Sequence, residues 1–278
     1  MAEILKGIAV ARKINDESVS LIREYGLKPV LALIRVGEKE SDLAYERNII
    51  KKCGELGIEI KIIQYNDNVK EEILLSKIGE LNSNDAVSAI MMFRPLPEHL
   101  DTDRIANTIS PKKDVDGSTI MSLSGLFADK SIGFTPCTAE AVIRMLDFYN
   151  TDIEGKDIVV IGRSLVIGKP VSMLLLRRNA TVTMCHSKTK NLKDIVKNAD
   201  IVIAAIGKAE YLGKDYFSSG QTVIDVGMNY SKEKSKLVGD VKFDEVSEIV
   251  DRISPVPGGV GSVTTSVLLN HIVKASKK

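Results

Sequence analysis

The sequence predicts an α/β protein made of two domains with parallel sheets, separated by a cleft. Its 278 residues exceed the usual size of one domain. Short β-branched runs alternate with longer amphipathic segments along most of the chain. Several of the short runs are almost wholly apolar, as strands covered on both faces of a parallel sheet are. The alternation therefore predicts parallel strands joined by helical crossovers.

The composition excludes several classes of protein. Because 38 basic residues balance 37 acidic residues, there is no overall field to attract nucleic acid or an anionic membrane. The three cysteines, Cys53, Cys137 and Cys185, are too scattered for a zinc site or a disulfide framework, and we expect no bound metal. The sequence starts without an apolar leader, and no run is long enough to span a membrane. We therefore expect a cytoplasmic protein.

The individual strands and helices are predicted from the same alternation. The β-branched runs indicate strands over Val30–Val36, Ile58–Tyr65, Ala86–Phe93, Asp157–Ile161, Thr181–Cys185, Asp200–Ile206 and Thr222–Val226. The amphipathic segments indicate helices over Ser41–Leu56, Lys70–Leu81, Lys169–Asn179 and Thr264–Ala275.

One stretch interrupts this alternation and marks a domain boundary. Residues 110–136 are rich in Pro, Gly, Ser and Asp and have no clear periodicity. We therefore expect a loop that both joins the domains and carries function. The first domain is predicted over residues 1–118, completed by a last helix over 262–278, and the second over 119–261.

A glycine turn follows the predicted strand Asp157–Ile161. Gly162, Arg163, Ser164 and Gly168 form a GxSxxxG spacing before the next helix. Such a turn lets the backbone approach a pyrophosphate, whose charge is held by N–H groups at the start of the helix. The spacing differs from GxGxxG, so a tight strand–helix turn without a ligand is the alternative.

The end of the next strand indicates which dinucleotide would bind. An NAD site usually ends this strand with an acid that holds the ribose 2′-hydroxyl. Here Ser187 and Lys188 follow the strand and Arg163 lies in the turn, so a 2′-phosphate would meet donors and positive charge. We therefore expect a Rossmann-type NADP-binding domain. The alternative is that Arg163 and Lys188 are ordinary surface charges.

Several motifs occur together and in one order. They are Val36-Gly37 with Tyr45, Arg94–Pro97, Pro111–Gly117 (PKKDVDG), Pro136–Thr138, Gly162–Pro170, Cys185–Thr189, Asp225–Gly227 and Pro255–Gly261 (PVPGGVG). In this order they resemble the methylene-tetrahydrofolate dehydrogenase family, most members of which are also methenyl-tetrahydrofolate cyclohydrolases. The resemblance spans nearly the whole chain, and PKKDVDG and PVPGGVG are its most specific strings.

The resemblance implies which residues contact substrate and cofactor. Tyr45 and Asp116 would be the catalytic residues, with Tyr45 against the folate and the Asp116 carboxylate accepting hydrogen bonds from the pterin. The loop with Pro257, Gly258 and Gly259 would close over the reacting centre. NADP would contact Gly162, Arg163, Ser164, Gly168, Ser187, Lys188 and Met228. The resemblance also implies tetrahydrofolate one-carbon derivatives as substrates, a role in one-carbon metabolism and purine biosynthesis, and a homodimer.

The folate side departs from the family pattern. The family's Lys, four residues after the Tyr and on the same helix face, is Ile49 here. The family's Gln is Phe93, and Arg94 stands where the family has Leu. We still expect Ile49 and Phe93 to line the substrate site. Elsewhere, Ser262-Val263 replace Pro-Met, and Ala139 and Ala141 replace Pro and Gly.

These departures affect two reactions unequally. Loss of hydride from the methylene carbon is assisted by a folate nitrogen lone pair and mainly needs alignment with the nicotinamide. Hydrolysis of the methenyl product needs proton transfer, which the family assigns to its Lys and Gln. Ile49 and Phe93 cannot do this, and losing a general acid or base typically costs ~10²- to 10⁴-fold in rate. We therefore predict a dehydrogenase with impaired or absent cyclohydrolase activity.

Three alternatives stay open. A bifunctional enzyme could use a displaced base such as Lys52, almost two helical turns beyond Tyr45 on a neighbouring face. The chain could bind folate or NADP without catalysis, since the folate side has changed while the dinucleotide motifs remain. It could also be a dehydrogenase that acts on a non-folate substrate.

Other polar residues are assigned no chemistry. We expect His99 at a helix start or on the surface, His186 beside the ribose phosphate, and His271 in a structural place on the last helix. A metal site at Asp114 and Asp116 is not favoured, because no further ligands lie nearby in the sequence.

Overall fold

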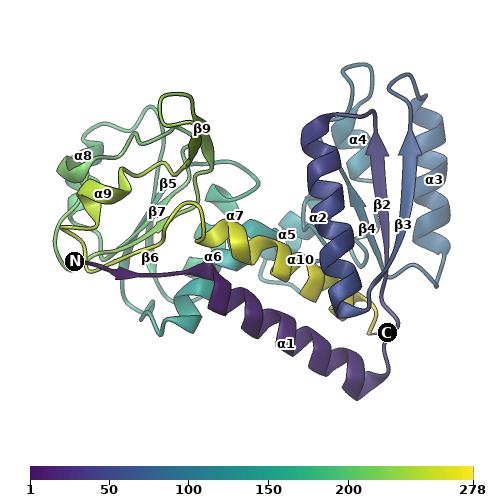
Figure 1. Ribbon diagram of the computed structural model, residues 1–278, viewed down its shortest axis with the longest axis horizontal. Coiled ribbons are helices and arrows are strands. Elements are labelled where there is room, and N and C mark those ends of the chain that lie inside the picture. The colour runs from purple at the N-terminus through teal and green to yellow at the C-terminus, as the bar shows by residue number, and fades with distance from the viewer. Residues whose placement is uncertain (278) are drawn as a thin grey trace. The chain divides into compact units, whose positions relative to one another are not determined.

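The computed structural model describes residues 1–277 and contains two compact domains. One, the three-stranded domain, comprises residues 14–137 and the chain from Leu268 onward. The other, the six-stranded domain, comprises residues 1–13 and 138–267. Both have parallel sheets with helices around them, so the predicted α/β class is confirmed (Figure 1). No helix in the described residues has the length and apolar character needed to cross a membrane.

The three-stranded domain has the strand order β3-β2-β4. Its strands are β2 (Val30–Val36), β3 (Glu59–Tyr65) and β4 (Ala89–Met92), and every residue of β2 is buried. One face of β2 packs in a common apolar cluster with α3 (Glu71–Ser83) and α4 (Thr102–Ala106). The other face meets α2 (Glu40–Leu56), which Figure 1 shows beside the sheet. The sheet is thus covered on both sides, which explains its continuous apolar strand.

The six-stranded domain has the strand order β1-β11-β8-β7-β5-β6, and all its pairs are parallel. The carboxyl ends of its central strands meet at one edge, because Ile161 pairs with both Cys185 and Ala204. Its strands are β1 (Glu3–Ile4), β5 (Asp157–Ile161), β6 (Thr181–Cys185), β7 (Ile201–Ala204), β8 (Thr222–Asp225) and β11 (Arg252–Ile253). A separate antiparallel hairpin consists of β9 (Asn229–Ser231) and β10 (Lys236–Val238).

The remaining helices complete both domains. They are α1 (Gly7–Tyr25), α5 (Ile120–Phe127), α6 (Cys137–Phe148), α7 (Gly168–Leu176), α8 (Leu192–Lys197), α9 (Phe243–Val246), α10 (Val260–Ala275) and the 3-10 helix η1 (Lys214–Tyr216). All predicted strands and helices are present, with ends that differ by at most a few residues from those expected. The sequence patterns did not predict α1, α5 or α6, the short helices α4, α8, α9 and η1, or the short strands β1, β9, β10 and β11.

The stretch 110–136 is more ordered than the sequence predicts. Instead of a continuous loop it contains α5, whose start is capped by the Thr119 hydroxyl accepting from the Ser122 N–H. The division between the domains also differs from the expected boundary at residue 118. Residues 119–137 belong to the three-stranded domain, because the Asp114 carboxylate binds the start of α5. Residues 1–13 belong to the six-stranded domain, where β1 pairs with β11.

Candidate functional site

A pocket in the three-stranded domain contains the sequence-predicted Asp116. It is small and partly open to solvent, and its polar lining consists of Arg94, Asp114, Asp116 and Ser118. Two segments bring these side chains together. The Ile90 N–H donates to the Lys113 carbonyl at 2.8 Å, so the chain before Asp116 runs beside the edge strand β4. The PKKDVDG motif therefore forms one wall of a pocket beside this strand.

The two carboxylates of this motif have different environments. Asp114 is 1% exposed, and its Oδ2 accepts from the Thr119 N–H at 2.8 Å and from the Ser122 hydroxyl at 2.6 Å. Asp114 therefore fixes the start of α5 and is not a free pocket group. Asp116 makes no such contact with the backbone of α5, and its side chain is 38% exposed. Of the two, Asp116 is the carboxylate that a ligand can reach.

The Asp116 carboxyl has a raised pKa and forms an ion pair with Arg94. Its Oδ2 lies 3.4 Å from Nη2 of Arg94, which has a side chain 31% exposed. Burial in the pocket raises the pKa of the Asp116 carboxyl, and the Arg94 guanidinium opposes part of this rise. Asp114 adds to the rise and His271 opposes it, both by charge. Arg94 was noted in the sequence only as a departure from the family's Leu.

Tyr45 and Phe93 lie together on the α2 side of the sheet. Their rings are 6.0 Å apart between centroids, in an edge-to-face arrangement at 68°. Phe93 is held by its N–H, which donates to the Ile34 carbonyl at 3.0 Å and continues the pairing of β4 with β2. Two of the four sequence-predicted substrate residues of this domain are therefore in contact.

Ile49 lies one helical turn beyond Tyr45 on α2 and has no exposed surface. It belongs to the buried face of this helix, which also includes Glu46, Cys53 and Leu56. Ile49 is thus a packed apolar residue in the structure, and its expected contact with the substrate stays a prediction. Lys52, the alternative base, is half-buried on the same helix.

A buried ion pair holds the start of α2 against β2. Arg35 Nε lies 3.0 Å from the Glu46 carboxylate, and the two side chains are only 4% and 8% exposed. The Arg35 guanidinium also donates to the Gly37 carbonyl, between β2 and α2. Glu46 directly follows Tyr45, so this pair helps to fix the helix turn that carries the ring. The sequence patterns did not reveal this pair.

The glycine turn between β5 and α7 has the geometry expected of a phosphate-binding turn. A side chain at Gly162, where φ is 141°, would place its Cβ 2.2 Å from the Ala205 carbonyl oxygen. A Cβ at Gly168 would lie 2.3 Å from the Gly162 oxygen. Ser164 accepts at its hydroxyl from the Ile167 N–H at 3.2 Å, at the start of α7. Both glycines are therefore required by close packing of the turn.

Ser187 and Lys188 lie in a second turn at the same edge of the sheet. The Gly162 N–H donates to the Cys185 carbonyl at 2.9 Å, which joins the two turns. His186 Nδ1 accepts from the Lys188 N–H at 3.1 Å, and the His186 N–H donates to the Thr189 hydroxyl at 2.8 Å. Ser187, Lys188 and Arg163 are all exposed, so donors and positive charge are available to an anion here.

Met228 follows β8 and is exposed, at the end of the strand beside β7. A buried carboxylate that the sequence patterns did not reveal, Asp240, holds the neighbouring loop. Its Oδ2 accepts from the Ile206 N–H at 2.6 Å and from the Gly207 N–H at 3.1 Å, after β7. Its Oδ1 accepts from Asn229 Nδ2 at 2.9 Å, next to Met228. The one available sequence signal is an isolated acid that directly follows Val238-Gly239.

The predicted substrate loop with Pro257, Gly258 and Gly259 belongs to the six-stranded domain. The Gly258 carbonyl accepts from the Gly7 N–H at 2.8 Å, so the loop is tied to the start of α1. A side chain at Gly259 would place its Cβ 2.4 Å from the Pro255 oxygen. The loop therefore needs its glycines for close backbone packing, and Pro257 and Gly258 themselves are exposed.

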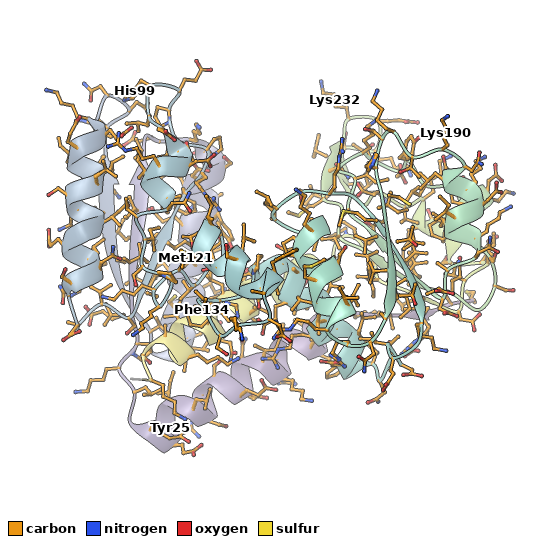
Figure 2. The ribbon with its side chains drawn as sticks, turned by 180° about the vertical axis from the view of Figure 1, so that it is seen from behind. Tyr25, His99, Met121, Phe134, Lys190 and Lys232 are labelled. Carbon is orange, nitrogen blue, oxygen red and sulfur yellow. The ribbon has the colours of Figure 1, made fainter. Side chains whose placement is uncertain are left out.

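The histidines lie where structural roles were expected. His99 is exposed, on the loop after β4, and Figure 2 shows it at the tip of the domain. Its Nε2 is 3.0 Å from the Val69 carbonyl. His271 is buried, with Nδ1 2.8 Å from the Val115 carbonyl and its ring 4.8 Å from that of Phe134, also labelled in Figure 2. His271 thus supports the chain just before Asp116.

A dinucleotide fits the groups at the carboxyl edge of the six-stranded sheet. Gly162 and Gly168 let the turn pack closely against its own backbone, and α7, which starts at Gly168, presents its amino-terminal N–H groups at this edge. Exposed Arg163 and Lys188 complement a further phosphate, and no acid replaces them after β6. These residues suit NADP better than NAD.

Comparisons with known proteins identify the family of both parts of the chain. The family model described as the catalytic domain of tetrahydrofolate dehydrogenase/cyclohydrolase matches residues 5–116, and the model of its NAD(P)-binding domain matches residues 136–278. A Clostridium botulinum protein named bifunctional protein FolD is 47% identical over 281 residues, which cover 100% of this chain and 99% of that protein.

Solved structures show the same relationship. The crystal structure of the bifunctional enzyme FolD, a methylenetetrahydrofolate dehydrogenase/cyclohydrolase from Campylobacter jejuni, has a TM-score of 0.95 and 38% identity, covering 100% of this chain and 99% of that one. The Trypanosoma brucei FolD, complexed with NADP cofactor and inhibitor, has a TM-score of 0.91 and 35% identity, covering 99% and 97%. The resemblance found in the sequence motifs is confirmed: this chain belongs to the tetrahydrofolate dehydrogenase/cyclohydrolase family, and its carboxy-terminal half is an NAD(P)-binding domain.

Proposed function

We propose that this chain is an NADP-dependent methylene-tetrahydrofolate dehydrogenase whose cyclohydrolase activity is impaired or absent. The family models, which match residues in both domains, support the dehydrogenase activity. The NADP complex of the Trypanosoma brucei relative supports the cofactor. The observation that carries the loss of the second activity is Ile49, an apolar residue without exposed surface where the family has its Lys.

In the proposed reaction the three-stranded domain orients the folate. Ionised Asp116 accepts two hydrogen bonds from the amino-pyrimidinone edge of the pterin, and Tyr45 packs against the folate with its ring angle set by Phe93. Bound NADP supplies the acceptor for the hydride of the methylene carbon. The folate nitrogen lone pair forms the iminium as the C–H bond breaks, so no side chain has to move a proton. Alignment is then the main contribution of the protein.

Hydrolysis of the methenyl product makes different demands. A base must take a proton from the attacking water, and the ring nitrogen must be protonated as the ring opens. Neither Ile49 nor Phe93 carries a group that can do this. An ammonium at position 49 would in addition oppose formation of the cationic methenyl product by charge repulsion. The same apolar residue thus suits the first reaction and not the second.

We expect a preference for NADP over NAD that depends on two exposed cations, Arg163 and Lys188. Arg163→Ala combined with Lys188→Ala is expected to lower kcat/KM for NADP about 10²- to 10⁴-fold and to leave that for NAD nearly unchanged, because each of the two charge-assisted hydrogen bonds contributes roughly 1.5–3 kcal/mol. The measurement is the rate of NADPH or NADH formation from methylene-tetrahydrofolate.

Lys190→Ala is the matched control for this measurement, since Lys190 lies in the same loop and is exposed (Figure 2). It should leave both rates unchanged. If the double variant lost kcat/KM equally with NADP and NAD, Arg163 and Lys188 would not be the residues that bind the 2′-phosphate. If the unaltered protein turned over with neither nicotinamide, the proposed function itself would be wrong.

Folate binding should depend on pH through Asp116. Because burial raises the pKa of this carboxyl, it takes up a proton at a higher pH than an ordinary Asp does. Affinity for tetrahydrofolate should therefore be complete above the raised pKa and fall as the pH falls through it. Calorimetric titration with tetrahydrofolate over a pH series measures this. The Asn side chain in Asp116→Asn cannot ionise, so this variant should bind tetrahydrofolate more weakly and without that fall in affinity at low pH. If the same fall in affinity remained in Asp116→Asn, the assignment to Asp116 would be wrong.

A second candidate is a fully bifunctional enzyme, favoured by the name of the Clostridium botulinum relative. Lys52 is the side chain of α2 that would replace the missing base. Methenyl-tetrahydrofolate hydrolysis by the unaltered protein that disappears in Lys52→Met would establish this candidate. Hydrolysis at the protein-free rate in both proteins would remove it.

We also propose that the protein acts in a reducing cytoplasm as a homodimer in one-carbon metabolism that serves purine biosynthesis. The cytoplasm is supported by Cys53, Cys137 and Cys185, which are buried and form no disulfide. The dimer rests on the family resemblance. Light scattering of the purified protein tests it, with the mass of two chains as the expected result.

A further inference from the structure

A cation lies next to the proposed pterin anchor. Arg94 Nη2 and Asp116 Oδ2 are 3.4 Å apart, and both side chains line the same pocket. Roughly a third of each remains exposed, 31% for Arg94 and 38% for Asp116. A ligand in this pocket that reaches the carboxylate therefore also reaches the guanidinium.

Among the described residues, the Arg94 side chain donates a hydrogen bond to Asp116 alone. The carboxylate of Asp114 accepts hydrogen bonds from Thr119 and Ser122, whereas the guanidinium donates to Asp116. In residues 1–277 the hydrogen bond to Asp116 is the one that the Arg94 side chain makes. A guanidinium has five N–H donors, so most of them stay available to a ligand.

The paired side chains present an ordered row of hydrogen-bonding groups. Oδ1 and Oδ2 of Asp116 are acceptors, and the Arg94 N–H groups beside Oδ2 are donors. A 2-amino-4-oxo-pyrimidine edge presents the complementary row, which consists of the 2-amino N–H, the N3–H and the 4-oxo oxygen. The amino group and N3–H match the carboxylate, and the 4-oxo oxygen then faces the guanidinium.

We propose that Arg94 is a specificity-determining residue of this pocket that donates a hydrogen bond to the 4-oxo oxygen of the pterin. It selects 4-oxo over 4-amino pterins, because a 4-amino group would turn its own donors toward the guanidinium. This inference rests on the proposed function. It adds a contact from a side chain that the family's Leu cannot make.

The test compares two ligands that differ at position 4. Tetrahydrofolate and its 4-amino counterpart, tetrahydroaminopterin, are titrated anaerobically by calorimetry into the unaltered protein, Arg94→Leu and Arg94→Lys. Arg94→Leu is expected to weaken tetrahydrofolate binding roughly 10- to 100-fold, the effect of one charged hydrogen bond, and to leave the 4-amino ligand unchanged or bound more tightly. Arg94→Lys should retain part of the preference.

Arg104→Leu is the matched control, because Arg104 also pairs with an acid, Glu71, but lies exposed on α4. It should leave both affinities unchanged. If Arg94→Leu lost affinity for both ligands equally, or lost none for tetrahydrofolate, the inference would be overturned. Should Arg94→Leu not fold, Arg94→Gln replaces it and must show the same reduced ratio. If the unaltered protein bound neither ligand, the proposed function would fail independently of Arg94.

Discussion

Replacing Ile49 by Lys and Phe93 by Gln in one variant is expected to raise the enzymatic rate of methenyl-tetrahydrofolate hydrolysis by roughly 10²-fold. The change restores the family's amine one helical turn beyond Tyr45 and its amide where the ring of Phe93 now stands. The rate is measured as loss of methenyl absorbance above that in protein-free buffer.

The matched control is Ile49→Met with Phe93→Gln, which has a long side chain at position 49 but no amine. It should not gain hydrolysis. Both original side chains are buried, at 0% and 8% exposure, and a lysine there will cost several kcal/mol in the free energy of unfolding. Thermal unfolding of each variant must therefore be measured alongside. Equal rates in the folded double variant, its control and the unaltered protein would contradict the role given to position 49.

Asp116→Asn is expected to lower kcat/KM for methylene-tetrahydrofolate about 10²- to 10³-fold. The carboxylate offers two acceptors to two pterin N–H donors, whereas the amide offers one acceptor and sets its own donors against the other. Hydrogen bonds to a charged group contribute roughly 1.5–3 kcal/mol each, and losing part of two of them gives this range. Steady-state rates of NADPH formation at varied folate measure the effect.

Asp103→Asn serves as the control for this variant, because Asp103 is an exposed acid on α4 of the same domain. It should leave kcat/KM unchanged. The KM for NADP should also be unaltered in Asp116→Asn, since the dinucleotide groups lie in the six-stranded domain. An Asp116→Asn protein with normal turnover would show that the pterin is anchored elsewhere.

Much of the fold follows from local patterns. The strands β2 and β5 have the predicted bounds because β-branched apolar runs are buried on both faces of a parallel sheet. The helix α5 was missed because its segment has two Ser and a Gly and no amphipathic period. It is stabilised by a contact distant in sequence, from the Asp114 carboxylate to Thr119 and Ser122, which no window of sequence reveals.

The residues of the site divide in the same way. Those carried by motifs, such as Asp116 and Gly162, lie in a pocket and in a close-packed turn as the sequence predicts. Three others were not predicted as parts of a site, namely Arg35, Arg94 and Asp240. Each acts through partners on another element, so its importance depends on tertiary packing. The grouping of residues 1–13 with the six-stranded domain is hidden for a related reason, because β1 joins a sheet that otherwise forms from residues far along the chain.

The central claim is that hydride transfer proceeds without enzymatic hydrolysis of its product. Incubating the protein with methylene-tetrahydrofolate and NADP, while following NADPH and methenyl-tetrahydrofolate together, tests this most directly. The two products should appear in equal amounts, and the methenyl compound should then decay only as fast as it does without protein. NADPH appearing together with 10-formyl-tetrahydrofolate, with no accumulation of the methenyl compound, would contradict the claim.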